Sequence, residues 1–217
     1  MDSKNEELIN KFIDWVLEKN KEFNLTSITN RKEFELKHIK DSLMLLEKVD
    51  WKYNNVIDIG TGAGIPGLIL AMALPDVHFT LLDSNKKKIH FIKLFCEKYK
   101  IKNISLVNER AELYNEERYD LVIARAVTSV PKLIEIMSHL VKVNGEIILY
   151  KGRHVEEEMC ERISKKIDEL GLVFKTIVKY NLNSENKRSL VIYKKMKTNK
   201  RGYPRSWKVI KRKDLCK

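Results

Sequence analysis

The chain has 217 residues, of which 43% are apolar and 33% are charged, and its formal net charge is +12. This length supports one full-sized core with appendages, and the composition excludes a disordered chain or a fibre. The polar start, MDSKNEELINKF, lacks the apolar region of a secretory signal, and the longest apolar stretch, GLILAMAL, is too short to span a bilayer. We therefore expect a cytoplasmic protein with no membrane partner.

The cysteines of the chain are Cys96, Cys160 and Cys216. They are odd in number, far apart in the sequence, and form no C-x-x-C motif. Such scattered cysteines are typical of free thiols in a reducing compartment. The sequence predicts neither a disulfide nor a metal site.

Residues 1–50 are expected to form a helical extension of two segments. Lys4–Glu22 has an amphipathic pattern. Asn30 can cap a second helix, and Glu33 stands at the capping-box position three residues later. In that helix, apolar residues recur at helical spacing and predict a buried stripe of Leu36, Ile39, Leu43 and Leu46.

Beyond residue 50, short apolar β-branched runs alternate with helical segments up to residue 195. The expected strands are Val56–Ile59, His78–Leu82, Ile104–Val107, Tyr119–Ala124, Glu146–Tyr150, Val173–Tyr180 and Ser189–Lys194. The expected helices are Gly67–Leu74, Asn85–Tyr99, Val130–Val143 and Val155–Leu170. This alternation predicts an α/β domain over residues 51–195, with a mostly parallel seven-stranded sheet and helices on both faces. The gap before the last strand is too short for a crossover helix, so that strand should be antiparallel.

The positive charge is concentrated at the C-terminus. Residues 194–217 contain 11 Lys and Arg side chains and one Asp, a net +10, with Tyr203 and Trp207 between the cations. Basic side chains neutralise phosphates and aromatic rings stack on bases, so we interpret residues 196–217 as a basic tail that binds nucleic acid. The alternative is a solvated, frayed chain end.

A glycine-rich loop, VIDIGTGAGIPG over residues 56–67, follows the first strand and opens a helix. Glycines let backbone N–H groups approach a ligand, and the helix N-terminus favours polar or anionic groups. Asp83 follows the second strand, 19 residues after Gly64, where an acid accepts hydrogen bonds from ribose hydroxyls. The pattern therefore predicts a nucleotide-like cofactor.

Two classes of cofactor fit this loop. The spacing Gly62-x-Gly64-x-x-Gly67 matches the dinucleotide fingerprint. Two residues count against a dinucleotide. Asp58 suits a ligand with an amino group better than a pyrophosphate, and Pro66 removes one N–H donor for phosphate at the helix start. The seven strands with an antiparallel end also differ from the six parallel strands of the dinucleotide fold.

These features resemble the Rossmann-like class I S-adenosylmethionine-dependent methyltransferases. The resemblance implies S-adenosylmethionine as cofactor. It implies that the loop is lined by Gly60, Gly62, Gly64 and Ile65. It also implies that the ribose and adenine are surrounded by Asp83, Ser84 and Asn85, with Ala111 and Glu112 of the ERAELY stretch beside the adenine.

Motifs that are absent from the sequence limit which atoms can be the methyl acceptor. Methylation at carbon 5 of a pyrimidine needs a thiolate, and no cysteine lies in a strand-end motif. Exocyclic amines usually need an Asn/Asp-Pro-Pro-aromatic loop after the fourth strand, where this chain reads YDLVIARAVTSVPK. Guanine N7 needs neither device, because its in-plane lone pair carries no proton and alignment with the methyl group suffices. Other lone-pair nucleophiles meet the same condition, and no catalytic residue is assigned.

Five ordered motifs resemble one family more closely: NLTSITNRKEFELKHIKDSL, DIGTGAGIPG, TLLDSNKKKIHFIK, YDLVIARAV and LYKGR. From Phe12 to Lys194 the chain is similar to the bacterial small-subunit ribosomal RNA guanine-N7 methyltransferases, also called glucose-inhibited division protein B. The resemblance implies an enzyme whose partner is ribosomal RNA or the small ribosomal subunit, with no obligate protein partner. The alternatives are a small-molecule methyltransferase, a dinucleotide-dependent oxidoreductase and a non-catalytic RNA-binding protein.

Four polar residues are candidates for contacts near the cofactor or the substrate. Arg125 ends the fourth strand at the ligand-binding edge of the sheet. A forked contact to guanine O6 and N7 would block N7, so Arg125 should hold the cofactor, a phosphate or O6 alone. His38 and Asp41 can share a helix face, either as a local ion pair or as a substrate contact. Lys151 follows the fifth strand and is expected either to contact a phosphate or to be solvated.

Overall fold

The computed structural model describes residues 3–115, 118–159, 163 and 166–216. The chain divides into two compact units, Met1–Glu109 and Arg110–Lys217. Its seven strands form a sheet of order β3-β2-β1-β4-β5-β7-β6, which confirms the expected α/β class. The first three strands belong to the first unit and the other four to the second.

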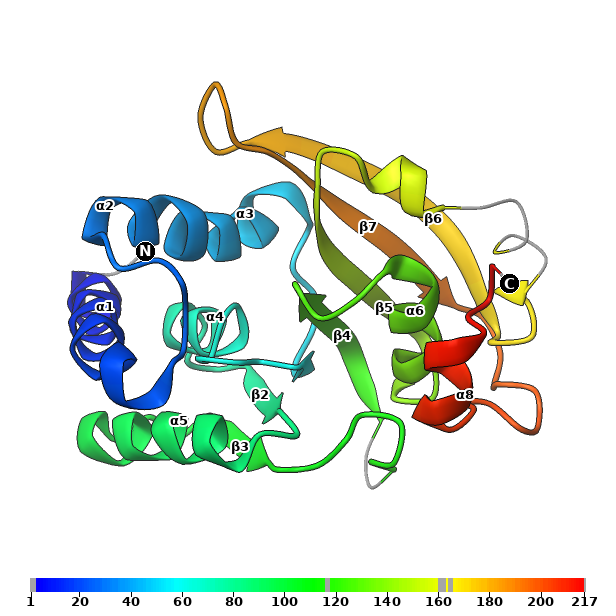
Figure 1. Cartoon of the computed structure of the whole chain (residues 1–217), viewed down its shortest axis with the longest axis horizontal. Coiled ribbons are helices and arrows are strands. Elements are labelled where there is room, and N and C mark those ends of the chain that lie inside the picture. The colour runs from blue at the N-terminus through cyan, green and yellow to red at the C-terminus, as the bar shows by residue number, and fades with distance from the viewer. Residues whose placement is uncertain (1–2, 116–117, 160–162, 164–165, 217) are drawn as a thin grey trace. The chain divides into compact units, whose positions relative to one another are not determined.

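The first unit contains parallel strands joined by crossover helices (Figure 1). Its strands are β1 (Asn55–Ile59), β2 (His78–Leu82) and β3 (Ile104–Val107), and its crossover helices are α4 (Gly67–Ala73) and α5 (Lys86–Tyr99). The N-terminal helix α1 (Ser3–Phe23) packs against both α4 and α5. Phe12 of α1 meets Phe95 of α5 edge-on, with ring centroids 5.2 Å apart. The amphipathic extension therefore completes the core of this unit.

The second N-terminal helix is interrupted by a π-helical turn. It consists of α2 (Arg31–Phe34), the π-helical η1 (Glu35–Lys40) and α3 (Asp41–Lys48). Asn30 caps it as predicted, because its Oδ1 accepts the Glu33 backbone N–H at 3.1 Å. The predicted stripe is largely wrong. Ile39 is buried, but the three leucines are half-buried, and Met44 and Leu45 are buried instead. A π-turn holds an extra residue and shifts the phase of all side chains that follow it.

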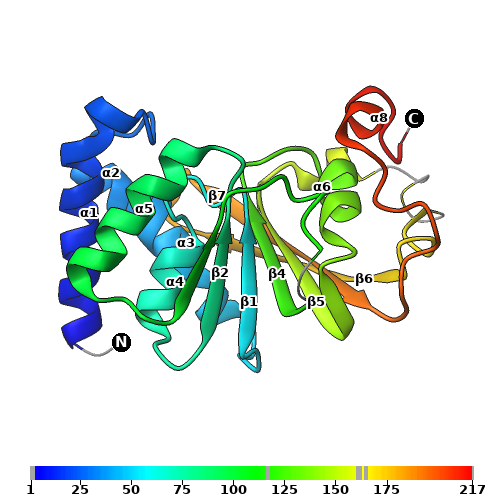
Figure 2. The same cartoon turned by 90° about the horizontal axis from the view of Figure 1, so that it is seen from below.

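The second unit contains the remaining strands: β4 (Tyr119–Arg125), β5 (Val141–Gly152), β6 (Leu172–Asn181) and β7 (Lys187–Lys195). β5 runs parallel to β4, and β7 runs antiparallel to both β5 and β6 (Figure 2). This confirms the predicted antiparallel final strand. A short loop of residues 182–186 joins β6 to β7, which leaves no room for a crossover.

Two predicted helices of the second unit differ from the structure. The helix expected over Val130–Val143 ends at Met137 as α6 (Val130–Met137), and β5 begins at Val141. The apolar residues around this boundary fit both a helical and a strand period, so periodicity could not place it. The described start of the helix expected over Val155–Leu170 is a 3₁₀ turn, η2 (Val155–Glu158). Residues 160–162 and 164–165 of that range lie outside the described residues.

The expected basic tail is folded. After β7 the chain forms α8 (Trp207–Arg212), which lies beside α6 in both views (Figures 1 and 2) and buries Ile210 and Leu215. The alternative of a frayed end is therefore wrong. The prediction of free thiols is also wrong at Cys216, which is disulfide-bonded. The spacing of cysteines along the sequence does not reveal which of them pair in the fold. Cys96 is free and buried, and Cys160 lies outside the described residues.

Candidate cofactor and substrate site

The glycine loop between β1 and α4 is held against the end of β2. The φ angles of Gly60, Gly62 and Gly64 are +68°, +61° and +93°, a region that residues with a Cβ rarely adopt. The backbone N–H groups of Gly60 and Thr61 donate to the Leu82 carbonyl at 2.8 and 3.0 Å. The predicted loop residue Ile65 is buried, and its N–H donates to Thr61 O at 2.9 Å. The loop thus has a fixed, turned shape.

Gly67 brings helix α4 close to the sheet. A Cβ at this position would lie 2.4 Å from Leu81 Cδ2 and 2.7 Å from Asp58 Cβ. The Gly67 N–H donates to Asp58 Oδ2 at 2.9 Å, and Asp58 is fully buried. Asp58 therefore anchors the first turn of α4, a role that the sequence motif alone does not indicate.

Asp83 is held by two backbone hydrogen bonds. Its Oδ2 accepts the Gly62 N–H at 3.0 Å and its Oδ1 accepts the Asn85 N–H at 2.8 Å. The residue is 8% exposed and forms no ion pair with any described residue. A carboxylate has about four lone-pair sites, so both oxygens can still accept another hydrogen bond. This geometry suits two adjacent hydroxyls, as in a ribose.

The neighbours of Asp83 fix its backbone and begin α5. Ser84 and Asn85 are exposed, and Asn85 Oδ1 caps α5 by accepting the Lys87 N–H at 3.0 Å. The Nδ2 of Asn108 donates to the Asp83 carbonyl at 2.9 Å. Asn108 was missed by the sequence analysis, although its place just after β3, at the ligand edge, was a usable signal. The first unit thus brings together the loop, Asp83, Ser84 and Asn85.

The second unit contains the other predicted cofactor residues. Ala111 is buried, and the carboxylate of Glu112 pairs with Arg110 Nε. Arg125 ends β4 and is half-buried, and Ala126 after it has a φ of +56°. That left-handed residue turns the chain sharply at the carboxyl edge of the sheet.

Lys151 has partners inside the second unit. Its Nζ donates to the Thr128 carbonyl at 2.7 Å and to Glu158 Oε2 at 2.8 Å. The same Glu158 oxygen accepts the Val130 N–H at 2.8 Å. Lys151 and Glu158 therefore fix the loop between β4 and α6, and a phosphate contact would have to use the third N–H of the ammonium group. The sequence pattern did not indicate Glu158.

His38 lies in the π-turn of the N-terminal extension. Its Nε2 is 3.1 Å from Thr26 Oγ1, and its ring stands edge-on to Phe34 with centroids 4.7 Å apart. Asp41 begins α3 and is 3% exposed. The contacts with Thr26 and Phe34 therefore hold the His38 ring in one orientation.

A hollow of about 650 Å³ in the second unit lies elsewhere. It is lined by residues from the start of β5, by Asn115 and Arg118, and by residues near the C-terminus, and it includes one predicted site residue, Glu112. The volume of a hollow therefore does not by itself indicate which residues bind a cofactor. In the described part of the chain no helix has the length and apolar character to cross a membrane. Nor do three described His, Cys, Asp or Glu side chains gather in a group suited to a metal ion.

Residues 5–191 match the family model of rRNA small subunit methyltransferase G, GidB. The chain belongs to this family. It is 40% identical over 218 residues to the ribosomal RNA small subunit methyltransferase G of Caldicellulosiruptor bescii, with 96% of this chain and 91% of the relative covered. It is 35% identical over 201 residues to the enzyme of the same name from Bacillus subtilis, with 89% and 84% covered.

Solved structures of class I methyltransferases share the fold of this family member. M. jannaschii TYW2 in complex with AdoMet matches with a TM-score of 0.57 at 15% identity, covering 72% of this chain and 74% of that one. The ribosomal protein L11 methylase of Lactobacillus delbrueckii matches with a TM-score of 0.55 at 16% identity, covering 77% and 81%. At such identities the likeness is one of fold, and it agrees with the seven-stranded sheet and its antiparallel β7.

Proposed function

We propose that this protein transfers the methyl group of S-adenosylmethionine to N7 of a guanine in small-subunit ribosomal RNA. The observation that carries the proposal is the anchored Asp83 carboxylate beside a loop of three positive-φ glycines, in a chain that matches the GidB family over most of its length. The antiparallel β7 supports this reading over a dinucleotide-dependent oxidoreductase.

The residues present fit the cofactor. Asp83 would accept hydrogen bonds from the ribose hydroxyls, while Gly60, Gly62, Gly64 and Ile65 would line its methionine part. Ser84, Asn85, Ala111 and Glu112 would adjoin the ribose and adenine. When bound, S-adenosylmethionine supplies an electrophilic methyl group. A carboxylate already fixed by two backbone N–H groups can bind without paying for its own ordering.

The chain's own residues would align the guanine rather than activate it. N7 carries no proton, so no side chain has to remove one, and orientation accounts for the catalysis. Arg125 would hold the cofactor, a phosphate or O6 alone, because a fork onto both O6 and N7 would cover the acceptor atom. Lys151 and Glu158 would keep the loop after β4 in place, and His38 and Asp41 are proposed substrate contacts.

The test is methylation of small-subunit RNA by the purified protein. We would incubate it with S-adenosylmethionine carrying a labelled methyl group and with either free small-subunit rRNA or assembled subunits, and map the modified nucleotide by mass spectrometry. The expected result is one methylated guanine that shows the strand cleavage specific to N7-methylguanine. Label on another atom or base, or none on either RNA form, would overturn the proposal.

A further inference from the structure

Two groups of cations lie in or next to the folded C-terminal segment, residues 196–216. One group points inward. Arg205 donates from Nε and Nη2 to the two oxygens of the buried Glu135 carboxylate, each at 2.7 Å. Lys195, just before the segment, donates to the carbonyls of Ser138 and Leu170 at 2.7 and 2.6 Å. Tyr203 adds a hydrogen bond to Glu169 at 2.8 Å. These contacts hold the segment on the second unit.

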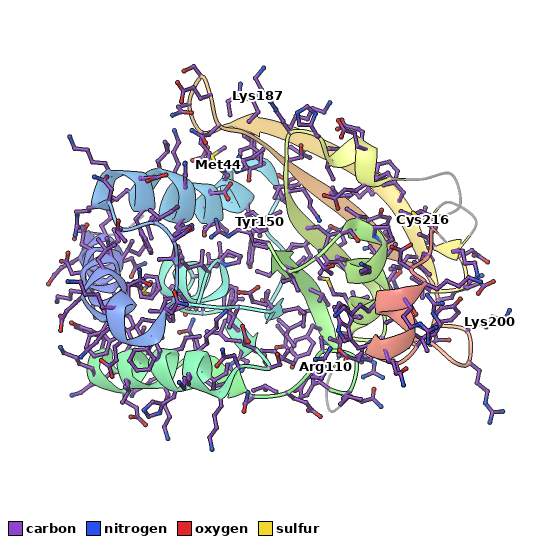
Figure 3. The ribbon with its side chains drawn as sticks, in the orientation of Figure 1. Met44, Arg110, Tyr150, Lys187, Lys200 and Cys216 are labelled. Atoms are coloured by element: carbon purple, nitrogen blue, oxygen red, sulfur yellow. The ribbon has the colours of Figure 1, made fainter. Side chains whose placement is uncertain are left out.

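The other group of cations points outward from α8. Its members are Lys208, Lys211, Arg212 and Lys213, which we call the α8 basic face. All four are exposed, and none forms an ion pair with a described residue. At 100° per residue, Lys208 and Arg212 lie on the side of the helix opposite the buried Ile210. Lys200, at the periphery of the segment (Figure 3), is also exposed, but its Nζ lies 4.0 Å from Glu169 Oε1.

The acid in this segment does not neutralise the α8 basic face. Asp214 accepts the backbone N–H of Cys216 at 3.0 Å, and its charge acts on Arg205, whose pKa it helps to raise after the larger effect of Glu135. Lys208, Val209, Arg212 and Lys213 line a hollow of about 390 Å³ on the surface of α8. Four like charges on about two turns of helix repel one another, so the face gains stability from a polyanion.

The helix that carries this face contacts a segment of the proposed cofactor site. The Arg110 guanidinium lies over the Trp207 ring at 5.4 Å, and Arg110 also pairs with Glu112. Ala111 and Glu112 are the residues proposed to adjoin the adenine. Within the second unit, the helix that carries the α8 basic face therefore contacts Arg110, which adjoins two of the proposed cofactor residues in the sequence.

We propose that the α8 basic face binds the phosphate backbone of the RNA substrate and adds affinity without choosing the base. This inference rests on the proposed function, which supplies a polyanionic substrate. An interfacial membrane helix would need an exposed apolar face, whereas Ile210 of α8 is fully buried and Val209 is its sole exposed aliphatic residue. RNA is the occupant that matches four exposed cations that form no ion pair with a described residue.

The test replaces all four side chains of the α8 basic face by glutamine and measures RNA affinity over a range of salt concentrations. The logarithm of affinity falls with a slope of about −0.7 per neutralised phosphate on single strands, so four lost contacts should flatten the slope by about 2 to 3. A matched control replaces four exposed lysines of the first unit by glutamine: Lys4, Lys21, Lys48 and Lys102. The control should change the slope by less than about 1. S-adenosylmethionine affinity should stay unchanged in both.

Two further measurements keep the outcome decisive. Replacing Lys208, Lys211 and Lys213 by arginine keeps the charge and should keep the wild-type slope, and thermal unfolding verifies that each variant is folded. The inference would be overturned by a folded glutamine variant whose RNA affinity has the wild-type salt dependence. It would also be overturned if that variant lost affinity for polyglutamate but kept its affinity for RNA. Methylation at low salt separates the two proposals: a variant that still methylates the same guanine leaves the proposed function standing, whereas a wild-type protein that methylates no RNA refutes that function.

Discussion

At the scale of single residues, Asp83 carries the most specific expectation. Its carboxylate is positioned by Gly62 and Asn85 before any ligand arrives, and a charge-assisted hydrogen bond typically contributes about 1.5–3 kcal/mol. Asp83→Asn keeps the size of the side chain but loses the charge, and its amide NH₂ must face a backbone N–H donor. We expect S-adenosylmethionine to bind at least about tenfold more weakly, as measured by calorimetry.

The exposed Asp76 offers a matched control, because Asp76→Asn makes the same chemical change in the same unit, away from the loop. That variant should bind the cofactor like the wild type. If Asp83→Asn also does so, with an unchanged circular dichroism spectrum, the ribose contact is assigned to the wrong residue.

His139 gives an expectation about stability and pH. Burial lowers the pKa of His139 to about 4, while its Nε2 donates to the Tyr114 carbonyl at 2.9 Å. In the unfolded chain the imidazole takes up a proton near pH 6.5, so between about pH 6.5 and 4 the unfolded state binds more protons than the folded state. The stabilisation is complete above pH 6.5 and is lost as the pH falls toward 4, by about 1–3 kcal/mol.

Urea unfolding at pH 7 and at pH 4.5 measures this loss. The stability of His139→Gln should fall less between these two pH values than that of the wild type, whereas the exposed His90→Gln should behave like the wild type. An equal fall in all three proteins would show that His139 is not the group that titrates.

At the scale of elements, a buried ion pair joins the C-terminal segment to α6. The Glu135 carboxylate is fully buried and receives three hydrogen bonds from Arg205, including one from its backbone N–H at 3.1 Å. Arg205→Met would leave that charge without its partner, which typically costs about 3–5 kcal/mol. We expect a loss near the lower end of this range in urea unfolding, because the arginine side chain is 25% exposed.

A double variant distinguishes loss of the ion pair from loss of packing. Arg205→Met combined with Glu135→Leu removes both charges and should recover most of the lost stability. The exposed Arg201→Met is the matched control and should change stability by less than about 0.5 kcal/mol. A double variant as unstable as the single one would mean that the arginine acts through its apolar stem.

The elements also show what the sequence could and could not predict. His78–Leu82 and Ile104–Val107 are correct to the residue because apolar runs bounded by turns define them. In the second N-terminal helix, the predicted buried face was wrong after the π-turn, because a regular helical period does not predict the extra residue of such a turn. The start of β5 was missed because Val141 and Val143 continue the helical pattern of α6 while also alternating as in a strand.

At the scale of the whole molecule, the alternation of strands and helices in the sequence predicted the sheet. It did not predict that the C-terminal segment packs on the second unit. A segment rich in lysine and arginine satisfies the pattern of a solvated tail, and its burial depends on partners such as Glu135 and Glu169 that are distant in sequence. The glycine loop and Asp83 were predictable because strand, loop, helix and acid occur at fixed spacings. Glu158 and the hydrogen-bond partners of Asn108 and Lys151 could not be predicted, since they are determined by tertiary contacts.

The pH dependence of methyl transfer depends on which groups of the whole molecule titrate between pH 6 and 9. Burial moves the pKa of His139 to about 4 and that of Cys96 to about 12, and burial together with Glu169 raises that of Tyr203 to about 12, all outside the range of pH 6–9. Burial lowers the pKa of Lys195 to about 8, but its ammonium donates to Ser138, Leu170 and Asn199 and therefore serves the fold.

Because N7 has no proton to lose, the single-turnover rate of methyl transfer should vary by less than about threefold between pH 6 and 9. Pre-bound enzyme, cofactor and RNA should be mixed at each pH and the methylated guanine quantified over time. A step near pH 8 that disappears in Lys195→Gln would report a change in the fold of the second unit. A rate that rises tenfold per pH unit across the range would instead require a general base, and the acceptor could then not be N7.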